Sequence, residues 1–179
     1  PRAGRWTYPG APWKFGVTPW QVGHRAPLLG EHSEAVRKDW ASSRPPSAPA
    51  PAPPSGDAAL PLAGVRVVAF TWVWAGPMAG MQLAHLGADV IKVESSQRMD
   101  TLRAGAPPFW QNTPGPNRSG YVNQYNQGKR SVALNLRHHE ALRLAHELIR
   151  RADVVLDNFG AGAMAVSYTH LTLPTILRV

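Results

Sequence analysis

The chain of 179 residues is 44% hydrophobic and contains no cysteine, which excludes disulfides and thiolate metal sites. Its formal charge of +8 would suit a nucleic-acid partner, but the cationic residues are scattered from Arg2 to Arg178 without a recognisable nucleic-acid-binding module. No apolar run reaches the length of a membrane span. We therefore expect one compact domain in the reducing cytoplasm, with neither nucleic acid nor a membrane as partner.

The first part of the chain divides into a short segment and a linker. Pro1–Trp40 is too short for a core of its own and predicts irregular chain followed by a helix at Glu31–Trp40, so it must dock elsewhere. The first residue, Pro1, begins no signal peptide, and we expect the start not to be biological. Arg44–Gly56 (RPPSAPAPAPPSG) predicts an extended linker, because proline lacks the amide donor that helices and central strands need.

After the linker, apolar patterning predicts a strand, a helix and a second strand. These are Val65–Phe70, Met78–Leu86 with Gly87 ending the helix, and Ala88–Val93. The following stretch, Glu94–Gln127, is polar and repeatedly interrupted by Pro and Gly, which predicts a long loop.

A second strand–helix–strand unit follows the predicted loop. Its strands are Ser131–Leu136 and Asp153–Leu156, and its helix is His138–Arg151. Alternating strands and helices indicate an α/β fold, a Rossmann-like parallel sheet with flanking helices. The pattern predicts a doubly wound α/β domain or half of one.

The last segment does not continue this pattern. A helix-opening signal at residues 158–164 is followed by VSYTHLTLPTILRV, Val166–Val179. Val166–Thr175 can be encoded by codons that resemble a transposon sequencing adapter, so we expect a non-native tail there. The alternative is a β-prone tail that packs on the sheet.

Ligands of open parallel sheets collect at the carboxyl ends of the strands, where loops expose backbone amides. Four such ends are predicted: residues 71–77, 94–97, 134–137 and 157–162. The first turn contains neither GxGxxG nor GxxxxGK[ST], which disfavours dinucleotide and P-loop binding.

Several side chains at these ends suit a nucleotide-like ligand. Trp72 or Trp74 could offer a flat face to an adenine or pantetheine, although each would equally serve as a core plug. Arg137 could pair with a phosphate or stay solvated. Asn158–Phe159–Gly160 offers an amide, a ring and a permissive backbone at one strand end.

The other titratable residues favour structural roles. His138, His139 and His146 predict a solvated helix face rather than a metal site, because adjacent helical positions point about 100° apart. Glu94 is expected to cap backbone or form a surface ion pair. Spacing alone specifies neither a Ser-His-Asp triad nor a carboxylate pair.

Three strings resemble the family III CoA-transferases, the group of formyl-CoA:oxalate and carnitine CoA-transferases and α-methylacyl-CoA racemase. They are PLAGVRVVAFTWVWAGPMAGMQLAHLGADVIKVE from Pro61, NQGKRSVALNLR from Asn126 and ADVVLDNFGAGAM from Ala152. Their order and spacing are similar to the N-terminal half of that family. The resemblance implies that residues 61–165 are the CoA-binding part of such a domain.

The resemblance also implies a set of CoA contacts, carried over from the family motifs. They are Val73, Trp74, Ala75, Ser95, Leu134, Asn135, Leu136, Arg137, Asn158, Phe159 and Gly160. Trp74 and Ser95 stand where formyl-CoA transferase has glutamine and arginine, which argues against an oxalate-specific enzyme. Arg98 and Arg103 are the candidates to supply the missing cation.

Enzymes of this family use an aspartate to attack an acyl-CoA thioester, forming a mixed anhydride and then an aspartyl-CoA thioester. The resemblance places that aspartate downstream of this chain, which is expected to be inactive alone. Acyl-CoA and a carboxylic acid acceptor are the implied substrates, without a metal. The racemase branch, which uses an acid/base pair, and a non-catalytic copy that only binds CoA remain alternatives.

Gly10–Val36 resembles the C-terminal end of the same family. The chain would then comprise the tail of one copy (1–40), a linker (41–60), the head of a second copy (61–165) and the adapter-derived tail (166–179). This order predicts a tandem fusion, with a chimeric assembly as the alternative. Fusion would turn the family's interlocked homodimer into an intramolecular pair at raised effective concentration.

Overall fold

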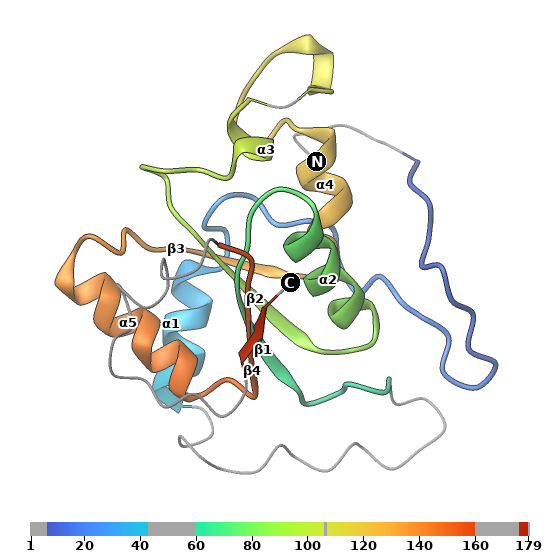
Figure 1. The fold of residues 1–179 in the computed structure, drawn as a ribbon, viewed down its shortest axis with the longest axis horizontal. Helices are drawn as coiled ribbons and strands as arrows, with labels where there is room; N and C mark the ends of the chain where they lie inside the picture. Colours follow the sequence, from blue (N-terminus) through green and yellow to red (C-terminus); the bar gives the residue numbers. More distant parts are fainter. Residues whose placement is uncertain (1–6, 43–59, 106, 160–175, 179) are drawn as a thin grey trace.

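A computed structural model describes residues 7–42, 60–105, 107–159 and 176–178. Its centre is a five-stranded parallel sheet with the strand order β3-β2-β1-β4-β5 (Figure 1). The strands are β1 (Arg66–Phe70), β2 (Asp89–Glu94), β3 (Arg130–Ala133), β4 (Val154–Asp157) and β5 (Ile176–Arg178). The sequence prediction of a parallel α/β sheet is confirmed.

Helices cover both faces of the sheet, as the crossovers between parallel strands require. Helix α2 (Ala75–His85) lies on one side, whereas α5 (His139–Arg150) and α1 (Ser33–Ser42) lie on the other (Figure 1). Successive residues of a strand point to opposite faces, so β1 sends Val67 toward α2 and Val68 toward α5. Both side chains are fully buried, each in a separate apolar core.

The N-terminal segment docks on the edge of the sheet beside β3, as predicted for a piece too short to fold alone. Val36 of α1 is fully buried in the α5-side core. Two hydrogen bonds fix the chain before α1: the His32 amide donates to the Ser131 carbonyl at 2.9 Å, and the His24 ring Nε2 lies 2.9 Å from the Lys129 carbonyl. Its origin in a preceding copy stays a prediction.

Residues 176–178 form β5 and pair in parallel with β4. This is the arrangement expected of a β-prone tail on the sheet. Most of the segment assigned to an adapter, and the whole Pro/Ala-rich stretch Arg44–Gly56, lie outside the described residues. The origin of the tail therefore stays a prediction.

The predicted long loop at 94–127 is wrong in part. It contains α3 (Thr101–Ala104), the 3₁₀ turn η1 (Trp110–Asn112) and α4 (Gly120–Tyr125). These pieces are too short to show an apolar period, and side-chain caps start two of them: Asp100 accepts the Leu102 amide and Ser119 accepts the Val122 amide.

The strand boundaries differ from the prediction by at most one residue, except at the end of β3. β3 ends at Ala133 rather than Leu136, although the Leu134 amide still donates to the Glu94 carbonyl at 2.8 Å. β2 extends to Glu94. In the part of the chain that the structure describes, no helix is long and apolar enough to span a membrane.

Candidate functional site

A pocket of about 470 Å³ lies at the carboxyl ends of β1, β2, β3 and β4. This is where an open parallel sheet is expected to bind ligands. The residues that line it come from all four strand ends: Phe70, Trp72, Val93, Glu94, Ser95, Arg98, Leu134, Asn135, Leu136, Arg137 and Phe159. Its apolar lining belongs to the α5-side core, so the pocket is an opening at the end of that core.

One wall of the pocket combines aromatic rings with a cation. Trp72 meets Phe159 edge to face, with ring centroids 5.4 Å apart and planes at 83°. The Arg98 guanidinium carbon lies 5.4 Å from the Trp72 ring centroid. Such a wall suits a ligand that carries both a flat or apolar part and phosphates, because the exposed guanidinium can donate to phosphate oxygens.

Six of the predicted contact residues line this pocket. They are Ser95, Leu134, Asn135, Leu136, Arg137 and Phe159. Val73, Trp74, Ala75 and Asn158 lie in or beside the neighbouring β1–α2 turn instead, and Gly160 falls outside the described residues. The contacts with CoA themselves stay a prediction.

The two tryptophans of the β1–α2 turn have different environments. Trp72 is half-buried and forms the pocket wall. Trp74 is 54% exposed and lies against Tyr121 and Tyr125 of α4, with ring centroids 6.1 and 6.4 Å away. Its exposure excludes the role of core plug.

Asn158 holds the backbone of Trp72 from both sides. Its Oδ1 accepts the Trp72 amide at 2.9 Å, and its Nδ2 donates to the Trp72 carbonyl at 2.8 Å. Asn158 also leaves no room for a side chain at Gly76, because a Cβ added there would lie 2.7 Å from the Asn158 amide carbon. Asn158 therefore fixes the turn that carries the pocket wall.

Glu94 forms a buried ion pair, so the expectation of a cap or surface pair is wrong. Its two oxygens accept from Arg103 at 3.0 and 2.8 Å, and Oε2 also accepts from the Ser131 hydroxyl at 2.7 Å. The Glu94 and Arg103 side chains are 2% and 1% exposed. Glu94 is buried because Arg103 of α3 and Ser131 of β3 both donate to its carboxylate.

This ion pair decides between the two candidate cations. Arg103 also donates to the Pro116 carbonyl and to Asn117, so its guanidinium is fully committed inside the protein. Arg98 is exposed and lines the pocket. Of the two, Arg98 is the one placed to meet a ligand.

Two lining residues, Phe70 and Val93, lie outside the predicted strand ends and were not named as candidates. Glu94 lies within the predicted end at residues 94–97, but a structural role was expected for it. Each is the last or next-to-last residue of a strand. The signal that could have found them is the strand-end rule itself, applied to the final buried residue of each strand rather than only to the loop after it.

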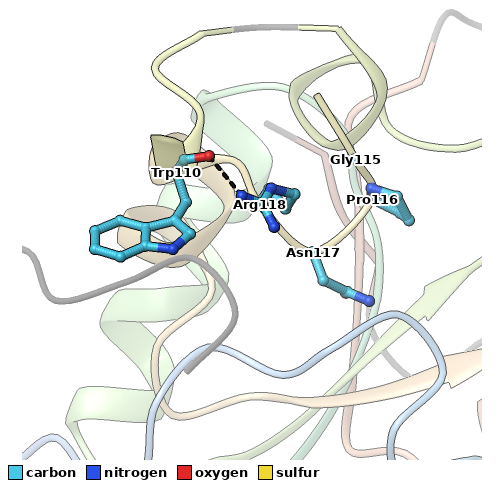
Figure 2. A pocket seen from close by; sticks show the side chains of 5 residues that line it. All are labelled: Trp110, Gly115, Pro116, Asn117 and Arg118. Carbon is cyan, nitrogen blue, oxygen red and sulfur yellow. Dashed lines mark hydrogen bonds between the residues drawn. The ribbon is translucent and has the colours of Figure 1, made fainter. Parts of the chain in front are cut away.

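A second hollow, of about 360 Å³, lies in the loop between α3 and α4 (Figure 2). Trp110, Gly115, Pro116, Asn117 and Arg118 line it. Arg118 donates to the Trp110 carbonyl at 2.9 Å and to the Thr113 carbonyl at 3.0 Å, so it braces the loop. None of the residues that line this hollow lies at a strand end.

Lys129 is a buried cation outside the pocket. Its Nζ donates to the Pro77 carbonyl at 2.6 Å and to the Tyr125 carbonyl and Asn126 Oδ1 at 2.9 Å, which joins α2 to α4. Burial lowers the pKa of Lys129 well below its usual value. Among the described residues, no group of three His, Asp or Glu side chains is arranged to hold a metal.

A parallel sheet with flanking helices and an aromatic and cationic pocket at its strand ends, without a glycine-rich phosphate loop, defines the class: an α/β protein with a candidate ligand site at the carboxyl edge of its sheet. Comparison with known proteins gives the family. The chain belongs to CoA-transferase family III, whose family model matches residues 62–172.

Curated relatives support the match. The chain is 45% identical over 106 residues to a succinate–glutarate CoA-transferase of Agrobacterium fabrum, covering 59% of this chain and 26% of that protein. It is 44% identical over 103 residues to a succinyl-CoA:mesaconate CoA-transferase of Haloarcula marismortui, covering 58% and 26%. The chain thus spans about a quarter of the length of these relatives.

Solved structures agree on the fold. A CAIB/BAIF family protein from Brucella suis superposes with a TM-score of 0.54 and 38% identity, covering 62% of this chain and 29% of that one. A hypothetical protein from Mycobacterium tuberculosis superposes with a TM-score of 0.53 and 34% identity, covering 66% and 33%.

Proposed function

We propose that this chain is the CoA-thioester-binding part of an acyl-CoA:carboxylate CoA-transferase. The observation that carries the proposal is the pocket, in which residues from four strand ends meet and to which six of the expected CoA contacts belong. Family membership makes a CoA thioester the nucleotide-like ligand to test first.

The pocket offers complementary surfaces to the parts of CoA. Arg98 and Arg137 are exposed at its rim, where guanidinium groups can form charge-assisted bonds with phosphates. Phe70, Val93 and Leu134 form an apolar floor that suits the pantetheine arm or the adenine. The Ser95 hydroxyl also lines the pocket, where it accepts the Gln97 amide at 3.2 Å and can donate its own proton to a ligand oxygen.

The relatives favour transfer over racemisation. The two curated relatives named above are CoA-transferases whose names include the dicarboxylic acids succinate, glutarate and mesaconate. We therefore propose a dicarboxylyl-CoA donor and a dicarboxylic acid acceptor. The whole enzyme is proposed to work as an interlocked homodimer or, if two copies are fused, as an intramolecular pair.

The pocket supplies binding without a free nucleophile. Of the lining residues that the structure describes, Glu94 is the carboxylate, and Arg103 and Ser131 already occupy both of its oxygens. We propose that the attacking aspartate comes from outside residues 61–165, so this chain alone binds CoA without transferring it. Measurable turnover of succinyl-CoA with a carboxylic acid would contradict this.

Titration calorimetry with CoA tests the binding proposal. Arg98→Ala should weaken CoA binding by about tenfold, the usual cost of a charge-assisted phosphate bond, and should leave pantetheine binding unchanged. Arg150→Ala is the matched control, because Arg150 is an exposed arginine at the end of α5 and does not line the pocket. Failure of the parent chain to bind CoA, or equal losses in both variants, would refute the proposal.

A further inference from the structure

The turn between β1 and α2 contains a strained residue. Val73 has φ at 65°, in the left-handed region that a β-branched side chain rarely adopts. Its side chain is 42% exposed, so its own packing offers little to offset the strain. Strained backbone persists where its surroundings over-determine it, and such residues cluster at functional sites.

A buried carboxylate holds this residue. Asp100 Oδ1 accepts the Val73 amide at 3.1 Å, which joins the loop after β2 to the turn after β1. The other oxygen, Oδ2, accepts from Lys92 Nζ at 2.9 Å, and both side chains are at most 2% exposed. Lys92 lies in β2, which pairs with β1, so the ion pair anchors the carboxylate to the sheet.

The same carboxylate fixes the segment that carries Arg98. Asp100 lies two residues after Arg98, and its Oδ1 accepts the Leu102 amide at 3.0 Å, which caps the start of α3. One side chain therefore holds both partners of the pocket wall: Trp72, through the adjoining Val73, and Arg98, through its own loop. These two meet with the Arg98 guanidinium 5.4 Å from the Trp72 ring.

We propose that Asp100, anchored by Lys92, is a positioning residue that sets Trp72 and Arg98 against each other for CoA binding. Asp100 does not line the pocket and acts through the strained turn. The inference rests on the proposed function, since CoA is the ligand for which the wall is arranged.

Three variants test the inference: Asp100→Asn, Val73→Gly and the double variant. Asp100→Asn sets an amide against the Lys92 ammonium and weakens the anchor, and CoA affinity should fall about tenfold. Glycine adopts positive φ without strain, so the double variant should regain CoA affinity to within about threefold of Val73→Gly alone. Its thermal midpoint should stay near that of Asp100→Asn, because Lys92 is still poorly paired.

A further variant and a control separate positioning from general stability. Lys92→Met/Asp100→Ser removes the buried charge yet keeps a hydroxyl that can start α3, and it should also lose CoA affinity. Asp89→Asn removes the pairs with Arg130 and Arg66 at the opposite end of β2. It should lower the thermal midpoint and leave CoA affinity unchanged.

Hydrogen exchange of residues 71–76 tests the anchor without any ligand. Asp100→Asn should speed exchange there, and Asp89→Asn should not. Unchanged exchange, unchanged CoA affinity, or a double variant that regains none of its affinity would each overturn the inference. A parent chain that binds no CoA would refute the proposed function instead, while exchange would still decide whether Asp100 holds the turn.

Discussion

Arg103 forms a buried ion pair with Glu94, a residue that lines the pocket. Replacing it with Met would leave Glu94 charged and buried without its cation, which typically lowers the free energy of unfolding by about 3–5 kcal/mol. Chemical denaturation measures this loss. The double variant Glu94→Gln/Arg103→Met should be more stable than Arg103→Met, because it buries no unpaired charge.

The exposed pair Arg143–Glu140 provides the control for this prediction. Arg143→Met should leave the free energy of unfolding nearly unchanged, because solvent screens a surface pair. Equal losses for Arg103→Met and Arg143→Met would contradict the assignment of a structural role to Arg103.

Lys129 makes stability depend on pH. Its pKa in the folded protein lies well below the usual 10.5, so the unfolded chain binds more protons between the two values. Stability from this residue therefore rises with pH toward 10.5 and is lost as pH falls toward the folded pKa. Denaturation between pH 7 and 10 should show the parent gaining stability relative to Lys129→Met.

Lys14→Met, at an exposed lysine, should show no such change relative to the parent. A constant difference between the parent and Lys129→Met across this range would contradict the prediction.

At the scale of single residues, sequence could name candidates but could not choose between them. Arg98 and Arg103 lie five positions apart in a segment without apolar periodicity, so nothing local separates a pocket cation from a buried one. The choice depends on how the segment after β2 folds over the sheet. Likewise, the exposure of Trp74 depends on α4, which contributes Tyr121 and Tyr125.

Short helices in this protein depend on their caps. Ser119 is buried and its hydroxyl accepts the Val122 amide at 3.3 Å, at the first turn of α4. Ser119→Ala should lower the free energy of unfolding by about 1 kcal/mol, the usual value of such a cap. Thr113→Ala, at an exposed hydroxyl in the same loop, is the control. Denaturation curves that coincide for both variants would rule out a capping role.

The elements that were predicted correctly from the sequence are those whose own residues show a clear apolar pattern. β1, β2 and β4 are runs of buried apolar residues, and α5 carries an apolar stripe, so pattern alone located them. The alternation then fixed the parallel sheet and its ligand-binding edge. α3 and α4 have no stripe of their own, because a cap and contacts with neighbouring elements determine them.

The whole described chain forms one packed unit, although residues 7–42 precede the proline-rich stretch. Val36 contributes to the α5-side core, and the Leu29 amide donates to Asn117 Oδ1 at 2.8 Å in the loop between α3 and α4. If this segment is the tail of a preceding copy, its contacts with the head resemble those between two halves of one fold. The linker would then serve mainly to raise the effective concentration of the tail.

A trans-complementation experiment tests this last point. Deleting residues 1–42 should lower the thermal midpoint, because it exposes the core around Val36 and leaves the Ser131 carbonyl without the His32 amide. A peptide of residues 7–42 added separately should raise the midpoint again, by an amount that grows with peptide concentration, since it binds the folded state. The same peptide with Val36→Asp should restore nothing, because it would bury an unpaired carboxylate. A deletion that leaves the midpoint unchanged would mean that the segment contributes no stability, and a concentration-independent midpoint would exclude binding in trans.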